Sequence, residues 1–276
     1  MSLRPELFRY LREFLLHKSG LVLDDSKLYL IRSRVQALLR NFEISDMDAL
    51  AQQIKRDENS KLAHHFLDAM TTNETLFFRD TYPFEALKTL VFPELIHVGN
   101  GHGNIKIWSA ASSKGQEPYS IAMTASETVP MADKRVSILG TDLSESAIAY
   151  AREAKYSQME VQRGMPVKQL VRFFTQEGLD WFVCDELKEM LTFQNGNLVN
   201  DALVSQVRRF GPFDIVFCRN VLIYFSPEER MNVIDRLAKT MKKGGYLFTG
   251  ATEIPEGHYS KWECVMFKGK RLWKLL

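Results

Sequence analysis

Residues 105–122 read IKIWSAASSKGQEPYSIA, and this stretch decides the fold class. A short β-rich run, IKIWSA, is joined through a turn of small residues to a helical stretch that begins near Glu117. A second unit of the same kind follows at 136–154, where VSILGTD leads into SESAIAYAREA and Ser144 is the expected N-cap. Strands that alternate with helices predict a mostly parallel sheet covered on both faces.

The alternation continues toward the C-terminus. The stretch SPEERMNVIDRLAKTMKKGG (226–245) is expected to form one helix, with Ser226 as its cap, Pro227 at its first position and glycines at its end. We expect further strands in four runs, MLTFQNGNL (190–198), FDIVFCRN (213–220), GYLFTGA (245–251) and CVMFKGKRLWKLL (264–276). The fold class that follows is α/β.

One segment, residues 157–189, interrupts the alternation. A single crossover would suffice there, yet the segment holds two short runs, LVRFF and LDWFV, on either side of TQEG. That pattern is typical of a hairpin. We interpret the segment as a small inserted subdomain of antiparallel strands, and an elaborated loop is the alternative.

The residues before the first strand contain only helical patterns. An apolar stripe made of Phe8, Leu11, Phe14 and Leu15 ends at Gly20, a plausible C-cap. A second helix is expected to start near Asp25 or Ser26, and two more are expected near 46–56 and 60–70. The predicted domains are an all-helical domain over 1–72, a linker over 73–83, and a domain over 84–276 that contains the insert.

Composition excludes several classes of protein. The chain has 276 residues, a net charge of +2 and 25% charged residues, so it lacks the basic excess typical of nucleic-acid binders. No run approaches the roughly 20 apolar residues that cross a bilayer, and the charged N-terminus does not resemble a secretory signal. Cys184, Cys218 and Cys264 are too widely spaced for a disulfide framework or a metal site. We therefore expect a cytoplasmic protein without metal.

Polar residues that follow the predicted strands indicate a ligand site, because ligands bind beyond the carboxyl ends of parallel strands. Glu117 follows the first strand, and Asp142 follows the second, where nucleotide-binding folds place an acid for the ribose hydroxyls. The glycine-rich GNGHG (99–103) precedes the first strand, so the G-x-G-x-x-G turn of a dinucleotide site is missing. A helix that opens with Glu117 would repel a pyrophosphate but suit an ammonium group.

These features favour a nucleoside that carries a zwitterionic amino acid, and S-adenosylmethionine is the ligand of that description. Two alternatives stay open at this point. Asp142 could cap the following helix with Glu145 as its partner, and Glu117 could be a favourable charge on the helix dipole.

The sequence resembles the CheR family of chemotaxis receptor methyltransferases. The resemblance rests on the segments TTNETLFFRD (71–80), WSAASSKGQEPYSIA (108–122), GTDLSESAI (140–148), NGNL (195–198) and FDIVFCRNVLIYF (213–225). It implies a Rossmann-like S-adenosylmethionine methyltransferase domain that forms glutamate methyl esters on receptors and releases S-adenosylhomocysteine. By position, it implies cofactor contacts from Asn73, Thr75, Arg79, Glu117, Asp142, Asn197, Leu198, Cys218 and Arg219.

Three of the residues that match the family, Arg79, Arg219 and Tyr224, would surround the transferable methyl group. A glutamate carboxylate, whose ordinary pKa is about 4.3, is ionised at neutral pH and needs no general base. The task that remains is alignment of the two reactants. Our hypothesis is that Arg79 and Arg219 orient the substrate carboxylate through paired hydrogen bonds and that Tyr224 completes the pocket.

The family's substrates are helical receptor bundles with acidic faces, which directs attention to the second helix. Residues 26–42 contain no acid, and the bases there are expected to face solvent. We predict a receptor contact at Lys27, Arg32, Arg34 and Arg40, with a solvated helix face as the alternative. The insert resembles the subdomain that binds a receptor C-terminal peptide in some members, but its short TQEG turn favours an enzyme that works without that tether. The enzyme would be cytoplasmic and recruited to receptor arrays.

Three other functions fit these residues less well. A methyltransferase that acts on a small molecule or RNA shares the cofactor site but gives no reason for the helical domain and the hairpin. A non-catalytic scaffold would not need Arg79, Arg219 and Tyr224. A nicotinamide dehydrogenase lacks its glycine fingerprint.

Overall fold

The computed structural model describes residues 3–24, 28–99, 103–251, 253 and 259–276. The chain divides into two compact units, residues 1–72 with 224–230 and residues 73–223 with 231–276. Within the described ranges, no helix is both long and apolar enough to span a bilayer.

The first unit is built on four helices, as predicted. They are α1 (Pro5–Ser19), α2 (Leu28–Asn41), α3 (Met47–Arg56) and α4 (Lys61–Met70). Gly20 ends α1 in the left-handed region at φ 71°, and the side chain of Asp46 caps α3 by accepting from the Ala49 N–H. Apolar side chains from all four helices form one core. The predicted caps Asp25 and Ser26 lie outside the described residues.

The second unit contains a seven-stranded sheet in the order β6-β2-β1-β7-β8-β10-β9. Its strands are β1 (Ile105–Ala110), β2 (Val136–Asp142), β6 (Leu191–Asn195), β7 (Phe213–Cys218), β8 (Met241–Thr249), β9 (Trp262–Phe267) and β10 (Lys270–Leu275). The first five run parallel, and β10 is antiparallel to both of its neighbours. The predicted parallel sheet is confirmed.

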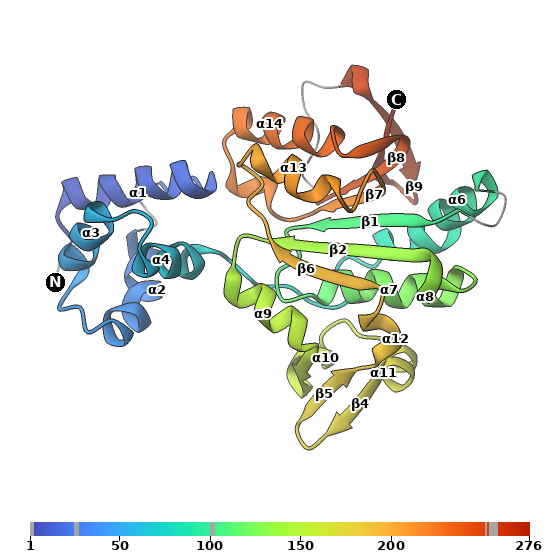
Figure 1. Cartoon of the computed structure of the whole chain (residues 1–276), viewed down its shortest axis with the longest axis horizontal. Helices are drawn as coiled ribbons and strands as arrows, with labels where there is room; N and C mark the ends of the chain where they lie inside the picture. The colour runs from blue at the N-terminus through green and yellow to red at the C-terminus, as the bar shows by residue number, and fades with distance from the viewer. Residues whose placement is uncertain (1–2, 25–27, 100–102, 252, 254–258) are drawn as a thin grey trace. The chain divides into compact units, whose positions relative to one another are not determined.

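The helices of this unit connect and cover the strands. They are α5 (Tyr82–Ala86), the π-helical turn η2 (Leu87–Val91), α6 (Phe92–Val98), α7 (Gln116–Thr128), α8 (Ala132–Arg135), α9 (Glu145–Glu153), α13 (Ala202–Arg208), α14 (Pro227–Ala238, whose first residues group with the other unit), and the short η3 (Leu222–Tyr224) and η4 (Tyr259–Lys261). Figure 1 shows α7 and α9 on one face of the sheet and α13 and α14 on the other.

The strand order reverses beside β1, because the chain passes outward to β2 and β6 and then returns to β7 on the other side. The register aligns the strand ends: Ala110 lies opposite Thr141, Asp142 opposite Asn195, and Cys218 opposite Thr249. The turns that follow these strands therefore leave from one edge of the sheet. A reversal point of this kind is where open α/β sheets bind ligands.

The predicted helix over 226–245 is too long at its C-terminus. Ser226 does cap α14, since its Oγ accepts the Glu229 N–H at 3.2 Å, but α14 ends at Ala238. From Met241 the chain is already strand β8, where Met241 lies opposite Phe213. In a helix, the backbone N–H and C=O groups of these residues would bond within the segment. Here they bond to β7 instead, which satisfies them equally well.

The insert is confirmed as a small antiparallel sheet in the order β3-β5-β4, but its first strand was misplaced. The first four residues of the LVRFF run end a helix, and its last residue, Phe174, begins the strand that continues through TQE. The turn therefore lies at Gly178–Leu179. The elements are β3 (Lys155–Ser157), α10 (Gln158–Gln162), α11 (Val167–Phe173), β4 (Phe174–Glu177), β5 (Asp180–Val183) and α12 (Asp185–Lys188).

Candidate active site

The turn after β1 is a strained loop that is bonded to the end of β2. The N–H groups of Ala111 and Ser112 both donate to the Thr141 carbonyl at 2.8 Å. Ala111, Ser113 and Gly115 have positive φ angles of 90°, 49° and 92°. Non-glycine residues in such conformations cost about 1–3 kcal/mol each and collect at functional sites. The loop keeps small side chains at the switch point.

Asp142 ends β2 and ties this loop to the next one. Its Oδ2 accepts the Ser113 N–H at 2.7 Å, and its Oδ1 accepts the Ser144 N–H at 2.9 Å. Ser144, as predicted, caps α9 by accepting the Ala147 N–H. The alternative that Asp142 caps this helix is therefore wrong. A carboxylate at the end of this strand is an acceptor group, which suits the two hydroxyls of a diol.

The segment before α5 lies against both turns. The Asn73 side chain donates to Ser144 Oγ at 3.1 Å, and its carbonyl accepts from Ser113 Oγ at 3.0 Å. Phe77 packs edge-on against Tyr156 of the insert, with ring centroids 4.9 Å apart. The segment is thus fastened to the two post-strand turns and to the insert, with Thr75 half-buried between these contacts.

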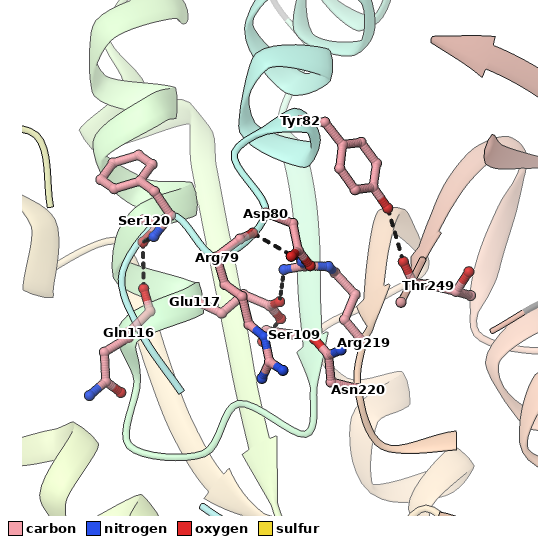
Figure 2. A network of polar contacts seen from close by, with 12 residues as sticks. Arg79, Asp80, Tyr82, Ser109, Gln116, Glu117, Ser120, Arg219, Asn220 and Thr249 are labelled. Atoms are coloured by element: carbon pink, nitrogen blue, oxygen red, sulfur yellow. Dashed lines mark hydrogen bonds and ion pairs between the residues drawn. The ribbon is translucent and has the colours of Figure 1, made fainter. Parts of the chain in front are cut away.

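Arg219, which follows β7, is the buried centre of a polar cluster (Figure 2). Its Nη1 donates to Glu117 Oε2 at 2.8 Å, and its Nη2 donates to Asp80 Oδ2 at 2.6 Å and to the Arg79 carbonyl at 3.0 Å. Glu117 also accepts from Ser109 Oγ at 2.8 Å. The Arg219 side chain is 1% exposed, so these are strong, charge-assisted contacts. One guanidinium therefore joins β7, the start of α7 and the segment before α5.

Arg79 differs from Arg219 in how its guanidinium is used. Its backbone is held between Phe78 at φ 51° and Asp80 at φ 67°, and its carbonyl accepts from Arg219. Among the residues that the structure describes, its guanidinium makes one long hydrogen bond, from Nη1 to the Glu74 carbonyl at 3.4 Å. In Figure 2 no dashed line joins this guanidinium to another drawn residue. Arg79 is the cation with spare donors, whereas the donors of Arg219 are largely used.

The carboxylates of the cluster suit a cationic ligand group. Two carboxylates, Glu117 and Asp80, face the one guanidinium of Arg219. Cys218, next in the chain, is fully buried, and burial, followed by the charges of Glu253 and Glu117, raises the pKa of its thiol. Cys218 is therefore a neutral wall of the site at neutral pH.

The turn after β6 approaches the same edge. The Gly196 N–H donates to the Asp142 carbonyl at 2.9 Å, which brings the NGNL segment beside the end of β2. Asn197 Oδ1 accepts the Val199 N–H at 3.2 Å, and Leu198 is buried. These contacts shape a turn with one apolar and one amide side chain next to Asp142.

The residues predicted to surround the methyl group are divided between the two units. Arg79 and Arg219 belong to the larger unit, whereas Tyr224 groups with the helical unit, where its carbonyl accepts the Val22 N–H at 3.0 Å. Arg79 also forms no ion pair with Asp80, whose partner is Arg219.

Among the predicted receptor contacts, Arg32 and Arg40 are exposed. Arg34 is only partly exposed, because its guanidinium donates to the Met70 and Thr71 carbonyls and to Thr72 Oγ1. Its guanidinium is therefore held at the end of α4 while the side chain still reaches solvent in part. Lys27 lies outside the described residues.

Sequence reasoning missed three residues of the site: Asp80, Ser109 and Glu253. Asp80 and Ser109 stand beside recognised motif positions but had no assigned partner. Glu253 gave no signal, since its carboxylate accepts backbone N–H groups from Asn220, Ile223 and Gly250, which only the fold brings together.

The residues at this edge fit S-adenosylmethionine. Ser112 Oγ and Gln116 Oε1 are buried without a hydrogen-bond partner among the described residues, so polar capacity is left for a ligand. Asp142 suits ribose hydroxyls, and the acidic cluster suits an ammonium group. Within the described ranges, no group of three potential metal ligands occurs.

Comparison with known proteins agrees with this geometry. Residues 6–71 match the family model described as CheR methyltransferase, all-alpha domain, and residues 73–269 match that described as CheR methyltransferase, SAM binding domain. The chain is 41% identical over 273 residues to chemotaxis protein methyltransferase 1 of Pseudomonas aeruginosa. The aligned region covers 96% of this chain and 97% of the relative. A chemotaxis protein methyltransferase of Vibrio parahaemolyticus is 40% identical over 279 residues, covering 100% and 98%. The Escherichia coli K12 protein of that name is 32% identical over 258 residues, covering 92% and 86%.

Proposed function

The chain belongs to the CheR methyltransferase family, and from this premise we propose that it methylates side-chain carboxylates of glutamate on chemotaxis receptors. The names of the relatives support a role in chemotaxis. The observation that carries the proposal is the Arg219 cluster, which joins Glu117, Asp80 and the Arg79 backbone at the switch point. It leaves the Arg79 guanidinium with spare donors beside an acidic cofactor site.

We assign the cofactor site to residues of three strand ends and the preceding segment. Asp142 binds the ribose, and Glu117 receives the ammonium group. The NGNL turn supplies Asn197 and Leu198 on the adenine side, and Cys218 forms a wall. S-adenosylmethionine supplies a methyl group on a sulfonium, which an ionised carboxylate can attack directly. The complete set of proposed cofactor residues is Asn73, Thr75, Arg79, Glu117, Asp142, Asn197, Leu198, Cys218 and Arg219.

The two arginines have different roles in this proposal. Arg79 receives the substrate carboxylate, because a planar guanidinium with spare donors can hold both carboxylate oxygens. Arg219 keeps Glu117 and the turn at Arg79–Asp80 in place. Because transfer neutralises the substrate charge, a guanidinium that held it too tightly would slow the reaction, so orientation is the main contribution. Tyr224 is proposed to complete the pocket around the methyl group.

We propose that residues 1–72 recognise the receptor, with 73–83 as the linker and 84–276 as the catalytic domain. The family models, which meet at residues 71 and 73, support the first boundary. The exposed Arg32 and Arg40 are the residues of choice for an acidic receptor face, with Lys27 beside them in sequence and Arg34 held at their edge. The enzyme would work in the cytoplasm at receptor arrays, without need of a C-terminal peptide tether at its short Gly178–Leu179 turn.

The test is transfer of labelled methyl from S-adenosylmethionine to a purified receptor cytoplasmic domain, with lability to alkali as the readout. We expect base-labile label that disappears when the receptor glutamates are replaced by alanine. Alkali-stable label would mean that another group is methylated. Charge reversal at Arg32 and Arg40 should slow the transfer and leave cofactor affinity unchanged; an unchanged rate would reject the receptor contact.

A further inference from the structure

We propose that Glu253 is a positioning residue, which holds the loop after β7 in the conformation that presents Arg219 to its partners. Glu253 is 6% exposed and lies just beyond the end of β8. Its Oε2 accepts the N–H groups of Asn220 at 2.8 Å and Gly250 at 2.7 Å, and its Oε1 accepts that of Ile223 at 3.1 Å. A single carboxylate thus bonds three backbone groups from the ends of two neighbouring strands.

These contacts make the carboxylate an internal anion in a nest of backbone donors. A carboxylate that accepts several N–H groups is held more firmly than a neutral acceptor would be. Gly250 is part of the arrangement, because a Cβ built there would collide with Glu253 Oε2. The backbone of Glu253 is anchored too, since its N–H donates to the Gly250 carbonyl at 2.9 Å and its carbonyl accepts from Thr249 Oγ1 at 2.5 Å.

The loop that Glu253 holds starts with Arg219. Asn220, the next residue, has φ 58°, a conformation that non-glycine residues adopt at a cost and only when the surroundings impose it. The Asn220 N–H donates to Glu253 in this conformation, and we assign the positive φ to that bond. Without it, the backbone at Asn220 could relax to a negative φ, which would rotate the chain beside Arg219. The bonds from Arg219 to Glu117 and Asp80 would then lengthen.

The inference rests on the cofactor site of the proposed function, in which Arg219 and Glu117 take part. If the inference is right, replacing Glu253 weakens cofactor binding, although Glu253 contacts the loop after Arg219 and has no assigned cofactor contact. The Glu253→Gln substitution preserves shape but sets an NH₂ group against a backbone N–H. We expect the Kd for S-adenosylmethionine, measured by calorimetry on the full chain, to rise about tenfold, the usual effect of one lost charge-assisted bond.

Amide hydrogen exchange provides a readout without cofactor. In Glu253→Gln, the N–H groups of Asn220 and Ile223 should exchange faster than in the wild type, while those of β1 stay protected. Glu253→Asp keeps the negative charge but shortens the side chain by one methylene. Its Kd and its exchange rates should therefore lie between those of the wild type and Glu253→Gln. It also keeps the proposal testable if Glu253→Gln does not fold.

The matched control is Asp214→Asn, the same chemical change at a buried acid on the opposite edge of the sheet. Asp214 accepts the Lys106 N–H at 2.9 Å and Lys242 Nζ at 2.7 Å. It should lower thermal stability and leave the Kd for cofactor unchanged. A folded Glu253 variant that binds cofactor as the wild type does, or whose Kd shifts no more than that of Asp214→Asn, would overturn the proposal.

Arg219→Lys separates this inference from the proposed function. If Arg219→Lys binds S-adenosylmethionine normally, the assignment of the cofactor site is wrong. If Arg219→Lys loses affinity and Glu253→Gln does not, only the role of Glu253 is wrong. Neither result depends on which protein accepts the methyl group.

Discussion

Strand β7 carries a buried charged residue near each end, and the two edges of the sheet treat these residues differently. At the amino edge, Asp214 has a partner for each oxygen, the Lys106 N–H and Lys242 Nζ. At the carboxyl edge, Arg219 bonds Glu117 and Asp80, but its buried Nε has no partner among the described residues. Asp214 therefore needs no ligand to satisfy its oxygens, whereas Arg219 keeps unused hydrogen-bonding capacity.

Backbone strain follows the same division. Of the ten non-glycine residues with positive φ in the described chain, six lie in the segments that build the candidate site: Phe78, Asp80, Thr81, Ala111, Ser113 and Asn220. Strained conformations persist only where surrounding contacts impose them, and they cluster at functional sites. Strain and unpartnered polar atoms together therefore identify the ligand edge, and buried charge alone does not.

The largest expected effect comes from Arg219→Ala at the carboxyl edge. It removes the cation from the largely buried Glu117 carboxylate, and breaking a buried ion pair costs about 3–5 kcal/mol of folding free energy. We expect cofactor binding to weaken by about a hundredfold or more, as measured by calorimetry, with activity lost in parallel. If affinity changed less than tenfold, the cluster would not be part of the cofactor site.

Arg79→Ala should act mainly on turnover. Its guanidinium has few protein partners, so the protein should fold normally, and we expect kcat for receptor methylation to fall about a hundredfold through loss of substrate alignment. The affinity for cofactor should fall by much less. Arg79→Lys is the matched control and should restore little, because an ammonium group cannot bind a carboxylate in the paired geometry. Normal turnover in Arg79→Ala would remove this role.

A smaller effect is expected for Ser112→Ala, which should preserve or raise stability but weaken cofactor binding. Removing a buried hydroxyl that has no partner should leave the ligand-free protein as stable as before, or more stable by about 1 kcal/mol. It should also weaken cofactor binding by up to about tenfold. Thermal unfolding with and without S-adenosylmethionine measures both. A destabilised ligand-free variant with normal affinity would show that the hydroxyl has a structural partner.

The smallest effect is expected at the amino edge. Lys242 is 40% exposed, and its pair with Asp214 is partly screened. Lys242→Met should lower the free energy of unfolding by less than about 1 kcal/mol and should not change cofactor affinity. Denaturant unfolding and calorimetry check the two parts. A clear loss of affinity would show that the two edges are coupled and would break the comparison.

Much of the fold could be predicted because it depends on local periodicity. The strand at Ile105–Ala110, the cap at Ser144 and the four N-terminal helices follow from apolar spacing and capping residues. The errors fell where tertiary pairing competes with local preference. Met241 continues a helical pattern in sequence but lies opposite Phe213 in the sheet, and LVRFF has strand composition but ends α11.

The sequence by itself determined the strand ends that carry the site, because a parallel sheet with covering helices sends the turns after its strands to one edge. It thereby singled out Glu117 and Asp142, and the resemblance to the family added Arg219. Only the tertiary structure decided which contacts these side chains make. The guanidinium of Arg219 bonds carboxylates, and that of Arg79 has donors to spare among the described residues. Glu253 accepts backbone N–H groups of the loop that follows Arg219. Hydrogen-bond partners more than a hundred residues apart, such as Glu117 and Arg219, are set by register and loop geometry, which have no local signal in the chain.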